Sequence, residues 1–505
     1  MSARRLAAVC AAVLALAAGS ASATPTPQPA PELSLDEQLQ QIFEHLKADR
    51  CEAALPLMRQ VFTRREFLQK PVAAQGVTYE MAGLCEMREG RIEAADELLA
   101  KADKVAGLHD FGLQARVLTG LYGGHVDQAV AALERLQAPD ALKAFKLELF
   151  QDLKQTLAAR EKADLRQRML AALDRLDFAP DEPFETFDAA WAEYARMIVD
   201  QNPAGAARAA ARISDPGPLL ELRLDKRFAA LVDAEPARFD LRAAAERKLA
   251  ADRAAMAANP KLLAGPHTVA SDLRVLGRAD EALAVLDAAL ARTEPNAWTD
   301  AGDQLRWARN ERAYALLALG RFDEAVAALR QGADLDEHGT LNVSQVINLA
   351  EVQLQVGRPE AALETLAVFE APERRASAYG VMWVKSGQAC AYAALGRKAE
   401  LRMTLTWLAA HADDNPAAHT RALLCAGDVD GAAASYKRRL ADPEQRADAL
   451  AALSQFDPPP VTAPGVKAAA ERLAQVRARP DVQAAIAKAG RVERVPLVSV
   501  YWGDI

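Results

Sequence analysis

Residues 309–326 read RNERAYALLALGRFDEAV, and this stretch decides the fold. An apolar helical run leads to Gly320, and a second amphipathic run follows at once. Glycine ends helices readily because it adopts the left-handed conformation of a C-terminal cap. Asp323 and Glu324 then fall in the first turn of the next helix, where the helix dipole favours negative charge. The stretch therefore predicts two helices joined by a tight turn.

The same phrase recurs along the chain, as Gly-Arg-x-x-Glu-Ala in its clearest form. A small residue is common seven positions before each glycine, an alanine usually stands five after it, and a large apolar residue nine after it. Small residues let two helices approach, and the large residue fills the space between them. Each pair leaves apolar surface that only a neighbouring pair can cover, so the pairs are expected to stack. The copies centre on Gly90, Gly124, Gly277, Gly320, Gly357, Gly396 and Gly427, with a weaker copy at Asp49.

This pattern resembles the tetratricopeptide repeat (TPR) family over about 34–138 and 260–440. The resemblance implies an all-α fold, a right-handed solenoid of antiparallel helix hairpins (a TPR-like superhelix) with a short extended C-terminal tail. Several repeat steps exceed the family's usual length, which implies longer helices or loops. Unrelated hairpins that share a turn are the alternative.

The patterns also predict how the chain is divided. The predicted segments are a signal peptide at 1–23, a Pro-rich spacer at 24–33, N-terminal TPR-like repeats at 34–138, degenerate helical hairpins at 139–258, C-terminal TPR-like repeats at 259–455, and capping helices with an extended tail at 456–505.

The least regular parts are residues 139–258 and the C-terminal end. In the first, helices are predicted over 141–176, 184–199, 219–231 and 239–256, with a worn copy of the phrase at Gln201-Asn202-Pro203. These helices either continue the solenoid or form a separate small helical domain. Near the end, helices are predicted over 466–478 and 481–489. The tail 492–502 is expected to lie along the solenoid as a strand or to hang free.

The N-terminus has the pattern of an export signal. Arg4 and Arg5 precede an apolar run over 6–18, and Ala21-Ser22-Ala23 matches a signal-peptidase site. We expect cleavage after Ala23 and a periplasmic or secreted protein. A lipoprotein anchored at Cys10 is the alternative. No later apolar run has membrane-spanning length, so membrane insertion is not expected.

The charge balance disfavours nucleic acid as a partner. The chain has 61 basic and 69 acidic residues and a formal net charge of −8. Phosphate binding needs a basic footprint, which this composition does not provide.

Four further cysteines form two pairs spaced by about one repeat. Cys51 begins a second helix and Cys85 lies near the end of the next first helix, so antiparallel packing predicts that they meet in a disulfide. Cys390 and Cys425 lie on first helices of adjacent repeats with an axial offset of roughly 6 Å. That offset is marginal for a disulfide, so a second bridge and buried free thiols both stay open.

No motif indicates catalysis, a cofactor or a metal site. The sequence contains no metalloprotease helix motif, phosphate-binding loop or nucleophile elbow. His411-Ala412-Asp413-Asp414 with His419 is a His/carboxylate cluster, which we interpret as a structural turn between helices. We therefore predict a protein that is not an enzyme.

The resemblance also implies a binding groove on the first helices of the pairs. Transferred to this sequence, the groove positions are Phe111, Gln114, Leu118 and Leu121; Trp307, Asn310, Tyr314 and Leu317; and Trp383 with Ser386. The family's basic-plus-Asn clamp for a C-terminal carboxylate is absent, since Tyr314 follows Asn310. Trp307, Tyr314 and Trp383 either anchor a ligand or pack between repeats.

The predicted function is a non-catalytic exported scaffold that binds a protein or peptide. The sequence identifies neither the partner nor the oligomeric state. One alternative is a helical solenoid enzyme acting on cell-wall glycan or polysaccharide. Another is a structural component of an envelope assembly.

Overall fold

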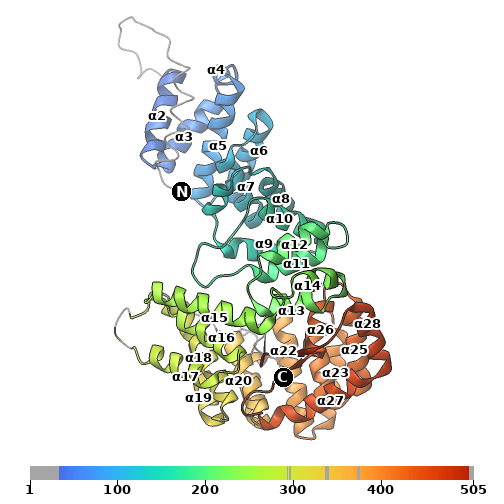
Figure 1. The fold of residues 1–505 in the computed structure, drawn as a ribbon. Coiled ribbons are helices and arrows are strands. Elements are labelled where there is room, and N and C mark those ends of the chain that lie inside the picture. The colour runs from blue at the N-terminus through green and yellow to red at the C-terminus, as the bar shows by residue number, and fades with distance from the viewer. Residues whose placement is uncertain (1–32, 293, 295–296, 336–340, 372–375, 500–505) are drawn as a thin grey trace, which may run out of the picture. The chain divides into compact units, whose positions relative to one another are not determined.

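The computed structural model describes residues 33–292, 294, 297–335, 341–371 and 376–499. These residues form helices packed in consecutive pairs, together with one short pair of strands, so the predicted all-α fold is confirmed. The chain divides into two compact units, unit 1 up to Asp181 and unit 2 from Glu182 (Figure 1). The predicted signal peptide, Cys10 and the tail beyond Ser499 lie outside the described residues. Within those residues, no helix is both long and apolar enough to cross a membrane.

Unit 1 is built of helices alone in its described part. Its elements are α2 (Leu35–Lys47), α3 (Cys51–Phe62), α4 (Arg65–Leu68), α5 (Val72–Arg88), α6 (Ile92–Ala106), α7 (Asp110–Tyr122), α8 (Val126–Arg135), the 3-10 turn η1 (Pro139–Ala144), α9 (Leu147–Ala159) and α10 (Ala163–Arg175).

Unit 2 contains the longer series of pairs. Its elements are α11 (Asp188–Ile198), α12 (Pro203–Ala211), α13 (Pro216–Leu224), η2 (Lys226–Phe228), α14 (Ala229–Ala234), α15 (Leu241–Ala258), α16 (Ala264–Val275), α17 (Ala279–Leu290), α18 (Ala301–Ala318), α19 (Phe322–Ala333), α20 (Val343–Gln355), α21 (Pro359–Leu366), η3 (Ala367–Glu370), α22 (Ala378–Ala394), α23 (Lys398–Ala410), α24 (Pro416–Ala426), α25 (Val429–Ala441), α26 (Arg446–Leu453), β1 (Gln455–Phe456), η4 (Pro464–Val466), α27 (Lys467–Ala478), α28 (Pro480–Ala489) and β2 (Arg494–Val495).

Every predicted anchor of the repeat is a left-handed turn. The seven anchor glycines have φ between 67° and 80°, and Asp49 has φ of 61°. Next to Gly320, the Arg321 amide donates to the Leu316 carbonyl at 2.9 Å. This long-range bond is the signature of the Schellman cap, which satisfies the last free carbonyls of a helix. The repeat register read from the sequence is therefore confirmed.

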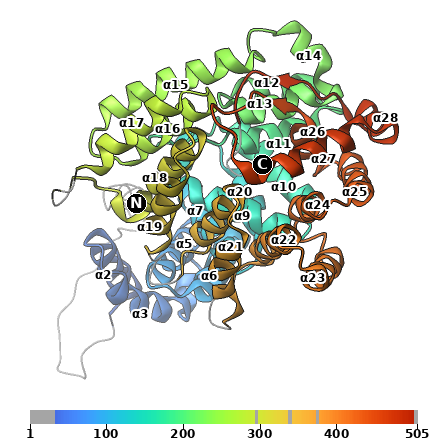
Figure 2. The ribbon, with the colours of Figure 1, turned by 90° about the horizontal axis from the view of Figure 1, so that it is seen from below.

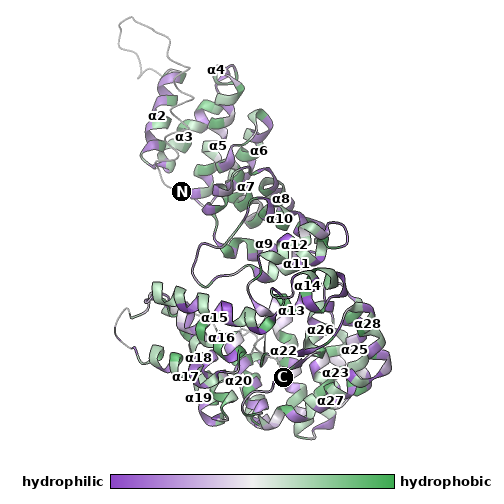
Figure 3. Ribbon diagram, in the orientation of Figure 1, coloured by the Kyte–Doolittle hydropathy of each residue, from purple (hydrophilic) through white to green (hydrophobic). Residues whose placement is uncertain are grey.

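The positions that flank the anchors form the core between helices. The alanines five residues after the anchors are fully buried, and most of the large residues nine after them are at most 4% exposed; examples are Ala95, Ala325, Leu99 and Leu329. Figure 3 shows hydrophobic and hydrophilic residues interspersed along the helices of each unit. This distribution is expected where a helix buries one face and hydrates the other.

The stretch predicted as helical over 141–176 is broken by a turn that the sequence search missed. Glu161 has φ of 54°, and the Lys162 amide donates to the Leu157 carbonyl at 2.9 Å. This is the same cap as at Gly320, with glutamate in place of glycine. The worn copy near Asn202 is a different turn, because the Asn202 side chain caps α12 by accepting from the Gly205 amide.

The C-terminal segment runs back over the helices of unit 2. β2 pairs in parallel with β1, the Val498 amide donates to the Val275 carbonyl at the end of α16, and the Val461 amide donates to the Ala318 carbonyl at the end of α18. Of the two predicted states of the tail, the extended strand along the helices is observed as far as Ser499. The helices α16, α18, α20, α22 and α24 follow one another in an arc, and α13 packs against α26 (Figure 2).

Both cysteine pairs form disulfides. Cys51 and Cys85 have Cα atoms 5.1 Å apart, and Cys390 and Cys425 have Cα atoms 4.9 Å apart. The first bridge joins α3 to α5 and confirms the predicted contact. The second joins the first helices α22 and α24, which approach more closely than the axial offset alone indicated.

Candidate functional site

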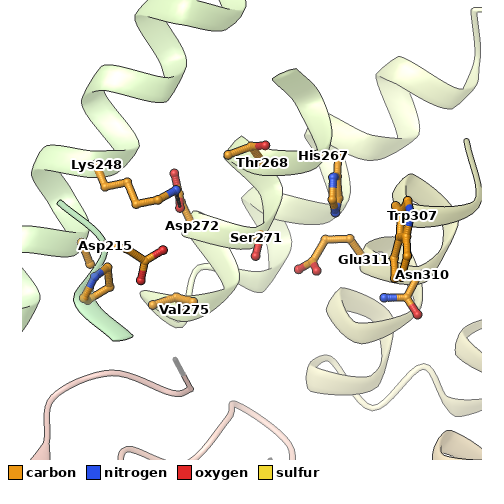
Figure 4. Close-up of a pocket in the computed structure, with 12 residues that line it drawn as sticks. Asp215, Lys248, His267, Thr268, Ser271, Asp272, Val275, Trp307, Asn310 and Glu311 are labelled. Carbon is orange, nitrogen blue, oxygen red and sulfur yellow. Dashed lines mark hydrogen bonds and ion pairs between the residues drawn. The ribbon is translucent and has the colours of Figure 1, made fainter. Parts of the chain in front are cut away.

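A cavity of about 220 Å³ lies among four helices of unit 2 (Figure 4). We call it the α16–α18 cavity, because these two helices contribute most of its wall. The residues that line it are Asp215 and Pro216 at the start of α13; Ala245 and Lys248 on α15; His267, Thr268, Ser271, Asp272 and Val275 on α16; and Trp307, Asn310 and Glu311 on α18. The lining residues of each helix recur at intervals of three or four, so each helix turns one face to the cavity.

Lys248 and Asp272 form the central ion pair of the cavity wall. The Lys248 ammonium donates to Asp272 Oδ1 at 2.7 Å and to Asp252 Oδ2 at 2.8 Å. Burial disfavours the charged form of Lys248, but the two carboxylates outweigh burial and raise its pKa. Lys248 therefore stays protonated near pH 7.

Burial raises the pKa of Asp272 to about 7, Lys248 opposes this effect, and the Asp252 carboxyl adds to it through a hydrogen bond and through its negative charge. Asp272 is 7% exposed, and its second oxygen, Oδ2, is buried without a hydrogen-bond partner. A carboxylate that keeps one oxygen unpaired in a buried position is costly. Asp272 is thus the least satisfied acid of the wall.

Asp215 is a second acid with a raised pKa. Burial is the main cause, and the charges of Asp188 and Asp252 add to it, while Lys248 and the Gly217 amide lower the pKa. Asp215 caps α13 by accepting from Gly217 at 2.8 Å. Its own amide is held by Asp188, so the α13 turn presents Asp215 to the cavity.

On α18, Glu311 is paired and His267 faces it from α16. The Arg274 Nε donates to Glu311 at 2.6 Å, and the Arg274 guanidinium lies 5.5 Å from the centre of the Tyr314 ring. Burial lowers the pKa of His267, so this imidazole is neutral near pH 7. The wall therefore carries more negative than positive charge.

Of the predicted groove residues of unit 2, two line the α16–α18 cavity and the others are not among its lining residues. Trp307 and Asn310 line the α16–α18 cavity, and Asn310 also accepts a hydrogen bond from Asn348 at 3.0 Å. Tyr314 is 7% exposed beneath Arg274. Trp383 is half-buried, with the Arg421 guanidinium 5.9 Å from its ring centre. Ser386 is fully buried, and Leu317 is 9% exposed.

The predicted groove residues of unit 1 are all half-buried. Phe111 is half-buried and stacks on His109 with ring centres 5.4 Å apart. The Gln114 amide donates to the Ala141 carbonyl at 2.7 Å. Leu118 and Leu121 are half-buried.

The His/carboxylate cluster is a helix end in the structure. His411 follows α23, stacks on Trp407 at 3.9 Å between ring centres, and lies 2.9 Å from the Trp407 carbonyl through Nδ1. His419 lies on α24 and is 6% exposed. Among the described residues, no group of three potential ligands could hold a metal ion.

The sequence search missed the acids and the lysine of the cavity. Asp215 stands in Asp215-Pro216-Gly217-Pro218, which indicates only a break between helices, and Lys248 lies in the irregular part of the chain. The one local signal is the spacing of Lys248 and Asp252, four residues apart on one helix face. Asp272 gave none, because its partner comes from another helix.

The class of protein follows from this architecture: the chain is an all-α protein of consecutive helix pairs whose turns share one repeated phrase. Residues 308–338 match the family model described as "Tetratricopeptide repeat". The matched segment covers α18 from Ala308 onward and the whole of α19, so this pair is similar to a tetratricopeptide repeat. Proteins with this repeat typically act as scaffolds for protein–protein interaction.

Solved structures of repeat proteins are similar to the chain at low identity. A tetratricopeptide repeat protein from Parabacteroides merdae is 12% identical, covers 67% of this chain and 99% of its own, and has a TM-score of 0.29. The TPR domain of P58(IPK) is 16% identical, covers 88% of this chain and 99% of its own, and has a TM-score of 0.18. No curated protein matches the chain.

Proposed function

We propose that this protein is an exported, non-catalytic scaffold that binds a protein or peptide on the first helices of unit 2. The observation that carries the proposal is the α16–α18 cavity, whose wall includes Asn310 and Glu311 of the matched repeat. Its wall combines Trp307 with polar side chains. Recesses that mix an aromatic anchor with a few polar groups are the usual centres of binding surfaces.

Rigidity supports the same interpretation. The Cys390–Cys425 disulfide joins two first helices, and the C-terminal segment bonds to the ends of α16 and α18. A surface that is already ordered loses less conformational entropy when a partner binds. Unit 2 is thus suited to present a preformed surface.

Export is supported by two independent features. Residues 1–23 have the pattern of a signal peptide, and both cysteine pairs are bridged. Disulfides persist mainly in oxidising compartments. Mass spectrometry of the protein recovered from its host tests this part: an N-terminus at Thr24 and no free thiols are expected. A full-length chain with four reduced thiols would contradict export.

Site-specific photo-crosslinking tests the binding surface. A photoreactive amino acid at Ser271, inside the cavity, should capture a protein partner in the intact host. The matched control is the same amino acid at Ala327, an exposed small residue on α19. A discrete crosslink at Ser271 that is absent at Ala327 supports the proposal. Equal capture at both positions, or capture at Ala327 alone, would exclude this surface.

One observation favours the glycan-cleaving enzyme as a second candidate. A carboxyl group with a pKa of about 7 in a cavity is what a general acid requires. Asp272 would be that acid, although its Oδ1 is held by Lys248. Release of reducing ends from peptidoglycan or polysaccharide by the wild type, lost in Asp272→Asn, would establish the enzyme. Equal background release by both proteins would exclude it.

A further inference from the structure

The size of the α16–α18 cavity limits what it can hold. Its volume of about 220 Å³ is below the roughly 300–1,000 Å³ of pockets that enclose drug-sized ligands. A cavity of this size accommodates one side-chain end or one small molecule. The chemistry of its wall then decides which kind of group is accepted.

The wall is acidic, and its cations are already engaged. We call the acids in and directly behind the wall the acidic cluster: Asp188, Asp215, Asp252, Asp272 and Glu311. The two facing cations are Lys248, which bridges Asp252 and Asp272, and Arg274, which pairs with Glu311. Above about pH 7, where Asp272 is ionised, the acids outnumber the two cations and leave an excess of negative charge, which neutral His267 does not offset.

One acid of the cluster has a buried oxygen without a hydrogen-bond partner, and a second has a raised pKa. Asp272 Oδ2 is buried and has no hydrogen-bond donor, although the residue is only 7% exposed. Asp215 has a raised pKa despite the nearby Lys248. Buried carboxylates are stabilised by a hydrogen-bonding cation, so both acids gain if a cationic group enters the cavity.

Trp307 gives the cavity an aromatic wall on the same helix face as Glu311, four residues away. An indole ring attracts an organic cation through its negative face. An anion would instead meet the excess negative charge, and a neutral alkyl group would leave Asp272 Oδ2 unpaired. The wall thus selects by charge as well as by size.

We infer that the α16–α18 cavity binds a primary ammonium or guanidinium group, which Asp272 and Asp215 accept through hydrogen bonds, while Trp307 lines the opposite side of the cavity (Figure 4). The group comes either from a lysine or arginine side chain of a protein partner or from a free alkylamine. The inference rests on the proposed function only for the first of these two sources.

The first test uses small probes on the wild-type protein, so that folding of a variant is not at issue. Isothermal titration calorimetry with n-butylammonium and n-butylguanidinium at about pH 8 should show binding, with a dissociation constant on the order of 1 mM. n-Butyrate and 1-butanol should give no saturable heat. Saturable binding of butyrate, equal binding of butanol, or no binding of either cation would overturn the inference.

Variants locate the site. Asp272→Asn keeps the shape of the side chain and should weaken butylammonium about tenfold or more. Trp307→Leu should weaken it by a smaller factor. The control is Asp287→Asn, which removes an exposed carboxylate paired with Arg312 on another face of the repeat. Thermal melts identify any variant that does not fold. An unchanged affinity in a folded Asp272→Asn variant contradicts the assignment.

The pH dependence adds a readout that simple steric effects do not change. Because Asp272 holds a proton up to about pH 7, a cation must displace that proton when it binds. Affinity should fall between about pH 8 and pH 6, and the binding heat should depend on the ionisation enthalpy of the buffer. Affinity independent of pH in the wild type would contradict a role for Asp272.

The source of the cation is separated by two further probes. A short peptide with one central lysine and blocked ends is compared with its norleucine analogue, and spermidine with a neutral polyether of equal length. Preference for the lysine peptide assigns the group to a protein partner, and binding of spermidine alone assigns it to a free amine. A Ser271 crosslink to a partner without any cation binding would reject this inference and leave the scaffold proposal standing. Cation binding without a crosslink would support this inference and reject the scaffold proposal.

Discussion

Among the residues that the structure describes, units 1 and 2 each bury an acid on a first helix, Glu80 and Asp272, and these two acids differ in how their oxygens are paired. Glu80 on α5 is fully buried, and both of its oxygens are used: Oε1 accepts from the His109 amide at 2.9 Å, and Oε2 lies 2.8 Å from His109 Nδ1. Asp272 on α16 is nearly as buried, yet its Oδ2 has no partner and the residue lines a cavity. A buried acid is thus not by itself a binding site.

What distinguishes the two acids is where their partners come from. Glu80 holds the start of α7, so its carboxylate replaces the missing cap of that helix. A Cβ on Gly112 would overlap the Glu80 side chain, which shows how closely α7 is seated on it. Asp272 shares Lys248 with Asp252 and caps nothing. An unpaired buried oxygen such as Asp272 Oδ2 calls for a partner, which a water, an ion or a ligand can supply.

The largest predicted effect is the loss of stability on removing a disulfide, and each unit contains one disulfide. Two double variants each remove one disulfide. The first, Cys51→Ala with Cys85→Ala, opens a loop with a sequence separation of 34 residues, and the second, Cys390→Ala with Cys425→Ala, opens one of 35. The free energy of unfolding of the host unit should fall by about 3 kcal/mol in each case. Hydrogen exchange, followed separately in each unit, measures the loss. A loss in one unit only would contradict this expectation.

The next effect should separate the units. Glu80→Gln removes the charge that pairs with His109 and leaves buried polar atoms without ideal partners, so unit 1 should lose about 2 kcal/mol of stability. The matched change in unit 2, Asp272→Asn, should alter stability by less than about 1 kcal/mol at about pH 5, because Asp272 is protonated there and resembles the amide. Chemical denaturation of both variants tests this. Equal losses would remove the distinction between the two acids.

A smaller effect on stability is expected when the turn at Glu161 in unit 1 is compared with the turns that contain glycine. Glu161 adopts a left-handed conformation that costs a residue with a Cβ roughly 1 kcal/mol. Glu161→Gly should therefore raise stability by about that amount, and Gly320→Ala should lower it similarly. Thermal unfolding of the two variants provides the measurement. Destabilisation by Glu161→Gly would mean that its side chain contributes more than its backbone costs.

The last effect, expressed per pH unit, is the pH dependence that Asp272 contributes. Its pKa in the folded protein, about 7, lies above its ordinary value of 3.8. The folded state therefore binds more protons between these values, so the stability from this group is highest at low pH and falls as pH rises to about 7. The change should stay below the single-proton limit of about 1.4 kcal/mol per pH unit. The free energy of unfolding of the wild type minus that of Asp272→Asn, measured from about pH 5 to pH 8, should show this slope. A difference that rises with pH would reverse the assignment.

The repeat was predictable because its signals are local. A glycine in a left-handed turn and small residues at fixed distances from it follow from the geometry of two adjacent helices, and Asp49 fits because Asp tolerates that conformation. Glu161 was not predictable, since glutamate carries no such preference. Trp307 and Asn310, which line the cavity, were predicted as groove positions from their register in the repeat, whereas Asp215, Lys248 and Asp272 were not predicted.

The sequence by itself determined the helix pairs, their turns and the first disulfide, since each depends on residues within about one repeat. Only the tertiary structure decided the α16–α18 cavity, because its wall joins α13, α15, α16 and α18, which stacking brings together across nearly a hundred positions of the chain. The charge state of that wall is also a tertiary property. Burial raises the pKa of Asp272 and Asp215 and lowers that of His267, and burial is set by packing between helices.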